Sequence, residues 1–168
     1  DGRFAVFENP SWIGEAVVYR RTTPGEGPTL QVELAHLPAD VVMVPPGTLD
    51  LLCTADCEPR AATLERVGPE EIVVTVDGGE GGLLVVAEQN QPGWSVEVDG
   101  TPASPITVDG MNIGVEIGPG PHEVVLRYRA PGLRLGIALS ALSLLAVALV
   151  ALGVPTAVLD RIRRRAAA

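Results

Sequence analysis

The sequence predicts a mainly β protein: a jelly-roll-like β-sandwich followed by one C-terminal transmembrane α-helix. Three observations predict this fold class. Short β-branched segments recur between turn residues in the second half of the chain, and the 168 residues include 19 Gly and 15 Pro. The third observation is a stretch of 25 residues without a charge, between Arg134 and Asp160. An apolar content of 46% excludes the composition typical of disordered chains.

The charges are divided unevenly along the chain. Residues 1–129 hold 7 Arg and 20 acidic residues, a net charge of -13, whereas residues 130–168 hold 5 Arg and 1 acidic residue, a net charge of +4. There is no Lys, and the overall charge of -9 excludes nucleic acid as a partner. Residue 1 is Asp, and no signal peptide opens the chain. We therefore expect that a secretion signal is cleaved or encoded upstream and that the chain ends a longer protein.

The first half of the chain contains less regular strand patterns. We expect strands at residues 3–7, 15–21, 40–44 and 61–67. Residues 30–37 fit two patterns: Leu30, Leu34 and Leu37 suit a short helix behind a Thr29 cap, and Leu30, Val32 and Leu34 suit a strand. We favour the short helix.

The second half of the chain contains a series of strand-like segments bounded by turn residues. Asp-Gly pairs at 77–78, 99–100 and 109–110 supply the positive backbone angles of tight hairpins, which predicts an all-β meander. The expected strands lie in residues 71–79, 83–90, 94–100, 106–110, 112–117 and 122–129.

Residues 135–159 carry no charge and predict the membrane span. As a helix they would extend roughly 37 Å, against about 30 Å of hydrocarbon. The alternative is a buried core helix, but a domain of this size rarely surrounds a helix that is apolar on every side. Gly136, Ser140, Ser143 and Ala151 recur at helical spacing. Either these residues form a face that packs on another transmembrane helix, or their spacing is a consequence of the Ala-rich composition.

A basic cluster follows the span. Arg161, Arg163, Arg164 and Arg165 predict a cytoplasmic C-terminus near anionic lipid headgroups, because positive charge favours the cytoplasmic side. The expected organisation is an extracytoplasmic sandwich at residues 1–130, a transmembrane helix at 131–159 and a cytoplasmic tail at 160–168.

Cys53 and Cys57 are the two cysteines, and the outward topology favours a disulfide between them. A zinc site is the alternative, but His36 and His122 lie in unrelated segments, so we expect no metal. No nucleophile elbow, phosphate loop or metal-ligand helix occurs. We therefore expect no catalytic residues and no cofactor.

Trp94 and Asp99 are the candidate binding residues. Trp94 could stack on a sugar ring, but it alternates with Val96 and Val98 on one face of a strand, which favours a place in the core. Ser95, Glu97 and Asp99 form the opposite, wet face. Both interpretations of Trp94 stay open at the level of sequence.

Several motifs follow one another in a recognisable order between residues 70 and 140. They are Leu83-Leu84-Val85-Val86-Ala87-Glu88-Gln89-Asn90-Gln91-Pro92-Gly93-Trp94, Val98-Asp99-Gly100, Gly114-Val115, Gly120-x-His122-x-Val124, Arg127-Tyr128, Pro131-Gly132 and Gly136. In order and spacing this region resembles the C-terminal end of YfhO-like bacterial membrane proteins. The likeness is fainter at residues 7–10, where the family continues with a Pro-Arg pair and this chain has Gly14-Glu15.

The resemblance implies a polytopic bacterial protein related to GT-C-type glycosyltransferases, which take a sugar from a polyprenyl-phosphate donor. The catalytic carboxylates of such enzymes belong to loops that this chain lacks. We therefore expect a non-catalytic outer domain and membrane anchor that positions acceptor glycan or braces the membrane core. Its partners would be the lipid bilayer, other transmembrane helices, and a cell-envelope glycan or lipid-linked sugar. The alternative is a membrane-anchored carbohydrate- or protein-binding module with no enzyme attached.

Overall fold

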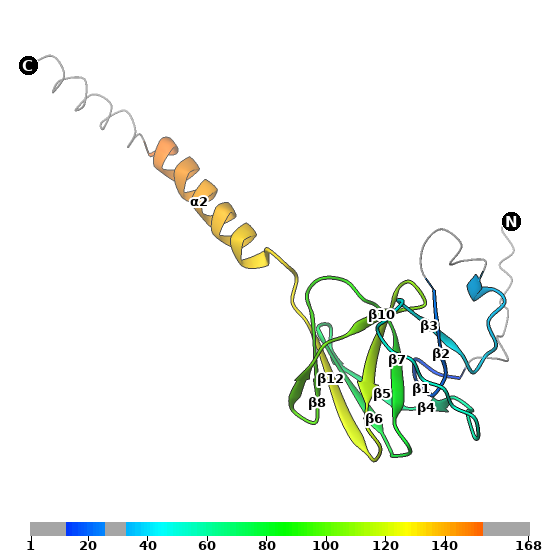
Figure 1. Ribbon diagram of the computed structural model, residues 1–168. Helices are drawn as coiled ribbons and strands as arrows, with labels where there is room; N and C mark the ends of the chain where they lie inside the picture. The colour runs from blue at the N-terminus through cyan, green and yellow to red at the C-terminus, as the bar shows by residue number, and fades with distance from the viewer. Residues whose placement is uncertain (1–12, 26–32, 153–168) are drawn as a thin grey trace, which may run out of the picture. The chain divides into compact units, whose positions relative to one another are not determined.

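The computed structural model describes residues 13–25 and 33–152. The chain divides into two compact units, residues 1–129 and 130–168. All of the described strands lie in the first unit, and the described part of the second unit contains one long helix (Figure 1). The fold is therefore mainly β with one C-terminal helix, as the sequence predicts.

The first sheet is built around its longest strand, β7 (Gly82–Gln89). β7 pairs in antiparallel register with β11 (Asn112–Ile117) on one side and β1 (Ala16–Tyr19) on the other. The outer strands are β10 (Ile106–Val108), beside β11, and β4 (Arg60–Ala61), beside β1. This sheet thus unites strands from both halves of the chain.

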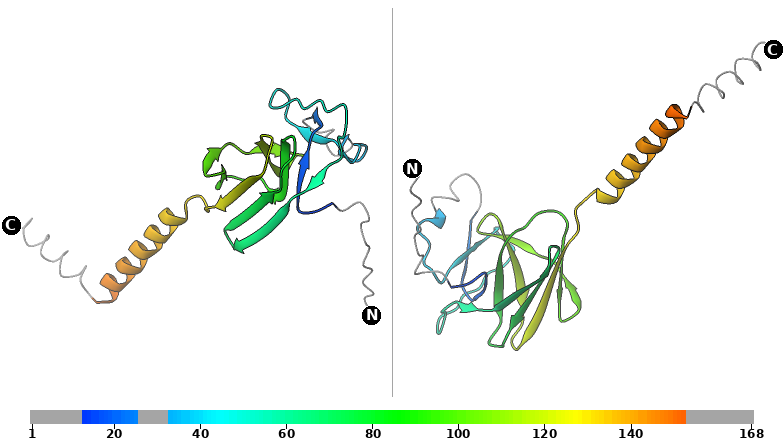
Figure 2. Two further views of the ribbon diagram at one scale, coloured as in Figure 1. Left: turned by 90° about the horizontal axis from the view of Figure 1, so that it is seen from below. Right: turned by 180° about the vertical axis from the view of Figure 1, so that it is seen from behind.

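The second sheet also has five strands, all antiparallel to their neighbours. Their order in space is β5 (Thr63–Gly68), β6 (Glu71–Val76), β12 (His122–Tyr128), β8 (Trp94–Val98) and β9 (Thr101–Ala103). The two sheets can be followed in Figure 2.

The main core lies between these two sheets. Alternate residues of both sheets form one buried apolar cluster, which makes the unit a β-sandwich. The cluster consists of Ala16, Val18, Ile72, Val74, Val76, Leu84, Val86, Val96, Ile113, Val115, Ile117, Val124 and Leu126.

A small third layer covers the outer face of the first sheet. β2 (Thr22–Pro24) and β3 (Val42–Val44) form a parallel pair, and Val42 and Val44 pack on Leu83 and Val85 of β7. Because β7 is covered on both faces, its apolar residues run continuously from Leu83 to Val86 and do not alternate with polar ones. The continuous run is therefore a signature of this extra layer.

The expected meander is wrong. Hairpins join β8 to β9 and β10 to β11 through Asp99-Gly100 and Asp109-Gly110, where all four residues have positive φ. Between hairpins, residues 90–93, 104–105 and 118–121 carry the chain to the opposite sheet. The Asp77-Gly78 pair likewise links β6 to β7 in the other sheet, so it is not a hairpin turn. Glycine- and proline-rich connections of this kind cross the sandwich rather than reversing within one sheet.

The first half also departs from the expected elements. The strand expected at 15–21 ends at Tyr19, and the expected strand at 61–67 is divided into β4 and β5. Of the expected helix at 30–37, the structure describes residues 33–37, in which Glu33 and Leu34 are helical. The strand expected at 3–7 lies outside the described residues.

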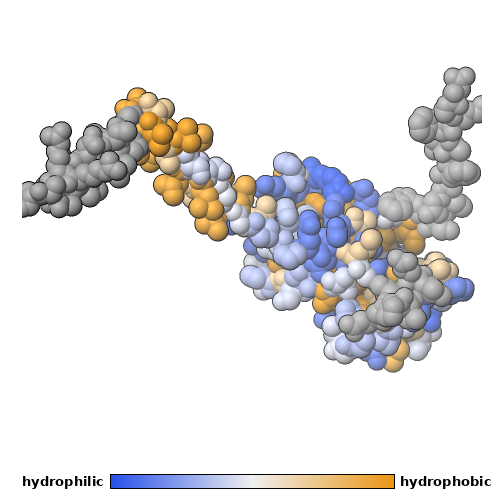
Figure 3. All heavy atoms as spheres, turned by 90° about the horizontal axis from the view of Figure 1, so that it is seen from above, coloured by the Kyte–Doolittle hydropathy of each residue, from blue (hydrophilic) through white to orange (hydrophobic). Residues whose placement is uncertain are grey.

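The second unit contains helix α2 (Leu133–Ala151). It has 19 residues, none of them buried, and is apolar and long enough to cross a membrane. At 1.5 Å per residue it extends about 28 Å, close to the thickness of the hydrocarbon core. Figure 3 shows that its described surface is largely hydrophobic, in contrast to the hydrophilic areas of the sandwich.

Candidate functional site

Trp94, the first candidate binding residue, begins β8 at one end of the sandwich. Its half-buried ring packs against the inter-sheet core, and its centroid lies 5.2 Å from that of Tyr128, with the planes tilted by 53°. The indole nitrogen is buried and has no hydrogen-bond partner among the described residues. The structure therefore places most of this side chain in packing contacts.

Asp99, the second candidate, lies just beyond the other end of β8. Its carboxylate accepts hydrogen bonds from the Glu123 backbone N–H at 2.9 Å and from His122 Nδ1 at 2.6 Å. These bonds, first the one from Glu123 and then the one from His122, lower the pKa of Asp99. Asp99 lies five positions after Trp94 along extended backbone, a separation of about 16 Å. The structure does not bring the two candidates together, and ligand binding by either stays a prediction.

His122 is held between two acceptors. Nδ1 faces the Asp99 carboxylate, and Nε2 lies 3.1 Å from the carbonyl oxygen of Gly118. Only the protonated ring can donate to both, so these contacts raise the pKa of His122, with the bond to Asp99 as the largest cause. Among residues 13–25 and 33–152, no group of three or more His, Cys, Asp or Glu residues could hold a metal ion.

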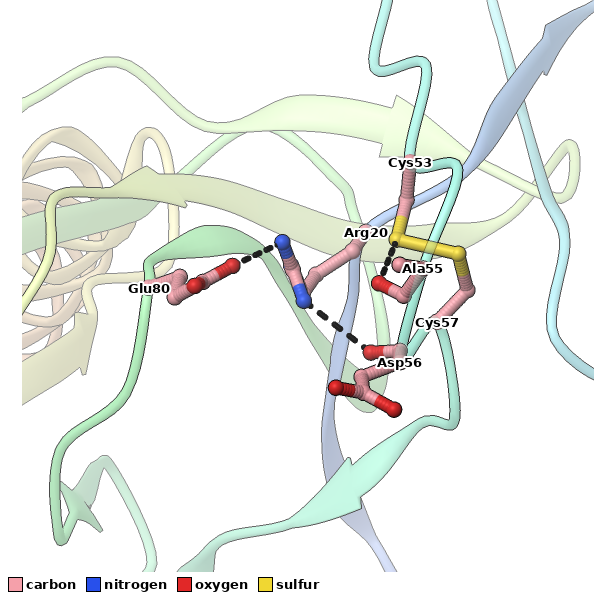
Figure 4. A network of polar contacts seen from close by, with 6 residues as sticks. All are labelled: Arg20, Cys53, Ala55, Asp56, Cys57 and Glu80. Atoms are coloured by element: carbon pink, nitrogen blue, oxygen red, sulfur yellow. Dashed lines mark hydrogen bonds and ion pairs between the residues drawn. A yellow bond between two sulfur atoms is a disulfide. The ribbon is translucent and has the colours of Figure 1, made fainter.

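Cys53 and Cys57 are joined by a disulfide with their Cα atoms 5.7 Å apart. The bridge closes a loop that lies beside the bend after β1 (Figure 4). The expected headgroup contacts Arg161, Arg163, Arg164 and Arg165 lie outside the described residues.

A pocket of about 520 Å³ opens beside the disulfide loop. Its wall includes Arg20, Leu52, Thr54, Asp56, Arg60 and Glu80. A smaller pocket of about 190 Å³ continues from it and shares Arg20 and Glu80. The residues of the larger pocket come from four separate segments of the chain. We call this larger pocket the Arg20–Arg60 pocket.

Arg20 links two of these segments. One guanidinium nitrogen donates to the backbone carbonyl of Asp56 at 3.0 Å, and the other pairs with the Glu80 carboxylate (Figure 4). The disulfide loop and the connection between β6 and β7 are thereby held to the same side chain. Asp56, whose carbonyl accepts this bond, has a positive φ of 49°.

Arg60 begins β4 and lies over the connection between β6 and β7. Its guanidinium donates to the backbone carbonyl of Gly78. Gly79 has a φ of 124°, and a Cβ on it would collide with the Arg60 guanidinium. A glycine at this position therefore lets Arg60 lie close to the backbone.

Arg60 differs from most other arginines of the sandwich in its ion pairing. Arg20, Arg21, Arg66 and Arg127 each pair with at least one carboxylate. In the described part of the chain, no ion pair is formed by Arg60. The pocket therefore contains a guanidinium that forms no ion pair with a described residue, although the carboxylates of Asp56 and Glu80 line the same pocket.

Sequence reasoning missed this pocket because its members are far apart in the chain and match no motif. One signal was present: Gly78-Gly79-Glu80-Gly81-Gly82 surrounds a single carboxylate with four glycines. Such a segment permits close approach of other groups to its backbone.

The family model described as bacterial membrane protein YfhO matches residues 55–140, just over half of the chain. The match includes Asp56, Arg60 and Glu80 of the pocket, the strands from β4 to β12, and the first two turns of α2. No curated protein and no solved structure matches the chain.

Proposed function

The chain belongs to the YfhO family of bacterial membrane proteins, and we propose that it is the non-catalytic outer domain and membrane anchor of a cell-envelope glycosyltransferase that uses a polyprenyl-phosphate sugar donor. The sandwich lies on the extracytoplasmic side, where it positions acceptor glycan or braces the membrane core. The catalytic carboxylates implied by the family resemblance belong to loops outside this chain, so no residue here is given a catalytic role.

The observation that carries the proposal is the relation of α2 to the core. Every residue of α2 is exposed, and both buried clusters are formed entirely by residues of the first unit. The helix thus contributes nothing to the core of the sandwich. An apolar surface of this length is stable in lipid, where the helix satisfies its own backbone hydrogen bonds. Membrane anchoring therefore accounts for an exposed apolar helix of this length.

Two further observations support the outward orientation of the sandwich. The disulfide between Cys53 and Cys57 suits an oxidising compartment outside the cytoplasm. The arginines at 161 and 163–165 favour a cytoplasmic C-terminus. A single span requires that the two ends lie on opposite sides, so both observations favour the same topology.

A cysteine-labelling experiment on cells that express the full-length protein tests this topology. In a Cys53→Ser/Cys57→Ser background, Thr101→Cys in the exposed edge strand β9 should react with a membrane-impermeant maleimide on intact spheroplasts. The matched variant Ala167→Cys should react only after permeabilisation. The opposite pattern, or protection of both cysteines, would overturn the proposed orientation.

The second candidate function is a membrane-anchored module that binds carbohydrate or protein with no enzyme attached. The Arg20–Arg60 pocket favours it, because the pocket needs nothing from the second unit. The reading frame upstream of Asp1 separates the two candidates. Several further hydrophobic spans favour the glycosyltransferase, and a signal peptide directly before Asp1 favours the module.

A further inference from the structure

We propose that the Arg20–Arg60 pocket binds the anionic group, a carboxylate or a phosphate, of a ligand of saccharide size. The inference deepens the acceptor-positioning role in the proposed function and rests on it only for the source of the ligand. Binding itself depends on the pocket alone, and therefore does not depend on which side of the membrane the sandwich occupies.

The charge of Arg60 is the first argument. It donates to one carbonyl oxygen and forms no ion pair within the described residues, so most of its five N–H donors remain available. A guanidinium binds carboxylate or phosphate through two parallel hydrogen bonds, which are stronger than bonds between neutral groups. An arginine in this state is suited to an anion that the protein itself does not supply.

The construction of the wall is the second argument. The disulfide fixes the 53–57 loop on one side, and Arg20 binds this loop and Glu80 at once. The lining also contains Gly79, where the absence of a side chain leaves room for Arg60. Both guanidiniums thus line one cavity whose walls are linked by covalent and polar contacts. Its volume of about 520 Å³ falls within the range of small-molecule sites.

Asp56 and Glu80 are the two carboxylates of the lining, and both oppose an incoming anion. Glu80 is the one that already pairs with an arginine of the pocket. Its side chain is 74% exposed and pairs with Arg20, whose side chain is 23% exposed. A ligand anion that approaches Arg60 meets repulsion from Glu80, and Glu80 can turn into solvent at low cost because it is so exposed. Removing the Glu80 charge should therefore strengthen binding, an effect that a purely structural role would not produce.

Binding can be measured on the full chain in nanodiscs of phosphatidylcholine. Sodium glucuronate is titrated in, and the shifts of the arginine Nε–H resonances are followed by NMR. Glucose at the same concentration is the neutral control. We expect saturable shifts with glucuronate at Arg60 and Arg20, and none with glucose. Shifts of equal size with both sugars would overturn the proposal, because recognition would not depend on the anion.

Three variants identify the groups responsible. Arg60→Gln should weaken glucuronate binding by about tenfold or more, the effect of losing a charge-assisted hydrogen bond. Glu80→Gln should tighten it by a few-fold. Arg66→Gln is the matched control, because Arg66 pairs with Glu15 and Glu88 away from the pocket, and it should bind as the unaltered chain does. Equal losses in Arg60→Gln and Arg66→Gln, or weaker binding in Glu80→Gln, would contradict the site.

The source of the anion is distinguished by a second set of nanodiscs. If phosphatidylglycerol in the disc shifts the Arg60 resonance without any soluble probe, the anion is a lipid headgroup. If glucuronate or glycerol phosphate is required, the anion belongs to a soluble glycan. Either result supports the anion site, and the absence of shifts with all three overturns it. The labelling experiment on cells is unaffected by this outcome, so the two proposals fail separately.

Discussion

At the scale of single residues, Trp94 combines two properties with opposite effects on the stability of the sandwich. Its ring packs on Tyr128 and on the inter-sheet core, while its indole N–H is enclosed without a partner among the described residues. The ring stabilises the sandwich through apolar contact, and the enclosed N–H reduces that gain because it has lost its hydrogen bond to water.

Substitutions at Trp94 should separate these two effects. We expect Trp94→Ala to lower the free energy of unfolding by about 2–4 kcal/mol, because the site is only partly buried. Trp94→Phe removes the unpartnered N–H and keeps an aromatic contact with Tyr128, so it should cost less than about 1 kcal/mol. Urea unfolding of the full chain in detergent, followed by circular dichroism, measures both. Equal costs would contradict this expectation, because the aromatic ring kept in Trp94→Phe would then add nothing to stability.

His122 and Asp99 link the β8–β9 hairpin to β12, and their pairing should make stability depend on pH. The pKa of His122 is raised in the folded state, so its contribution is complete below about pH 6.5 and is lost as pH rises through the raised pKa. The pKa of Asp99 is lowered, so its contribution is present above its unfolded value and is lost as pH falls through the lowered pKa.

We expect the urea concentration at the midpoint of unfolding to decrease as the pH is raised from 6 to 9. His122→Gln should remove most of this dependence, while the dependence at acidic pH that comes from other carboxyl groups persists. One such group is Asp109, whose pKa is raised by burial. A variant as pH-dependent as the unaltered chain between pH 6 and pH 9 would exclude His122 as the titrating group.

At the scale of elements, the short 53–57 loop is linked through Arg20 to the connection between β6 and β7. The disulfide restricts the unfolded chain, and for five residues the chain-entropy relation gives about 2 kcal/mol. We expect Cys53→Ser/Cys57→Ser to lower the free energy of unfolding by about that amount and to leave the strands intact. Thermal unfolding checks this, with a reducing agent as the control: it should lower the midpoint of the unaltered chain and leave that of the variant unchanged.

The elements of the second half were predictable from sequence, and their partners were not. β6, β7, β8, β10, β11 and β12 lie where β-branched segments between turn residues place them. The assignment of successive strands to opposite sheets depends on contacts between residues far apart in the chain. No local pattern specifies such contacts, so the expected meander failed although the strands were correct.

Two short strands escaped prediction for a different reason. β9 (Thr101–Ala103) contains Pro102, which lacks an N–H and is tolerated because β9 lies at the edge of its sheet. β2 (Thr22–Pro24) ends in proline and pairs with three residues of β3. Segments this short show no clear alternation. The Arg20–Arg60 pocket was missed on similar grounds, since tertiary structure alone brings Arg20, Arg60 and Glu80 together.

At the scale of the whole molecule, the sequence divides into two parts with opposite solvent requirements. The first carries a net charge of -13 and encloses its apolar residues in its own clusters. The second is an exposed apolar helix followed by a basic tail. Residues 130–132, Ala-Pro-Gly, join them, and Gly132 has a φ of 75° that favours glycine before the helix. Nothing in either buried cluster requires the helix.

The final prediction follows from this division. Residues 1–129, produced without residues 130–168, should remain in water without detergent and unfold cooperatively at nearly the same temperature as the full chain in detergent. Far-UV circular dichroism and sedimentation measure these properties, and the full chain without detergent, which should aggregate, is the control. Because the sandwich core is formed without α2, loss of the helix removes apolar surface and no core contact. A truncated chain that aggregates or melts far below the full chain would show that the sandwich depends on the membrane segment for its stability, and α2 would then be more than an anchor.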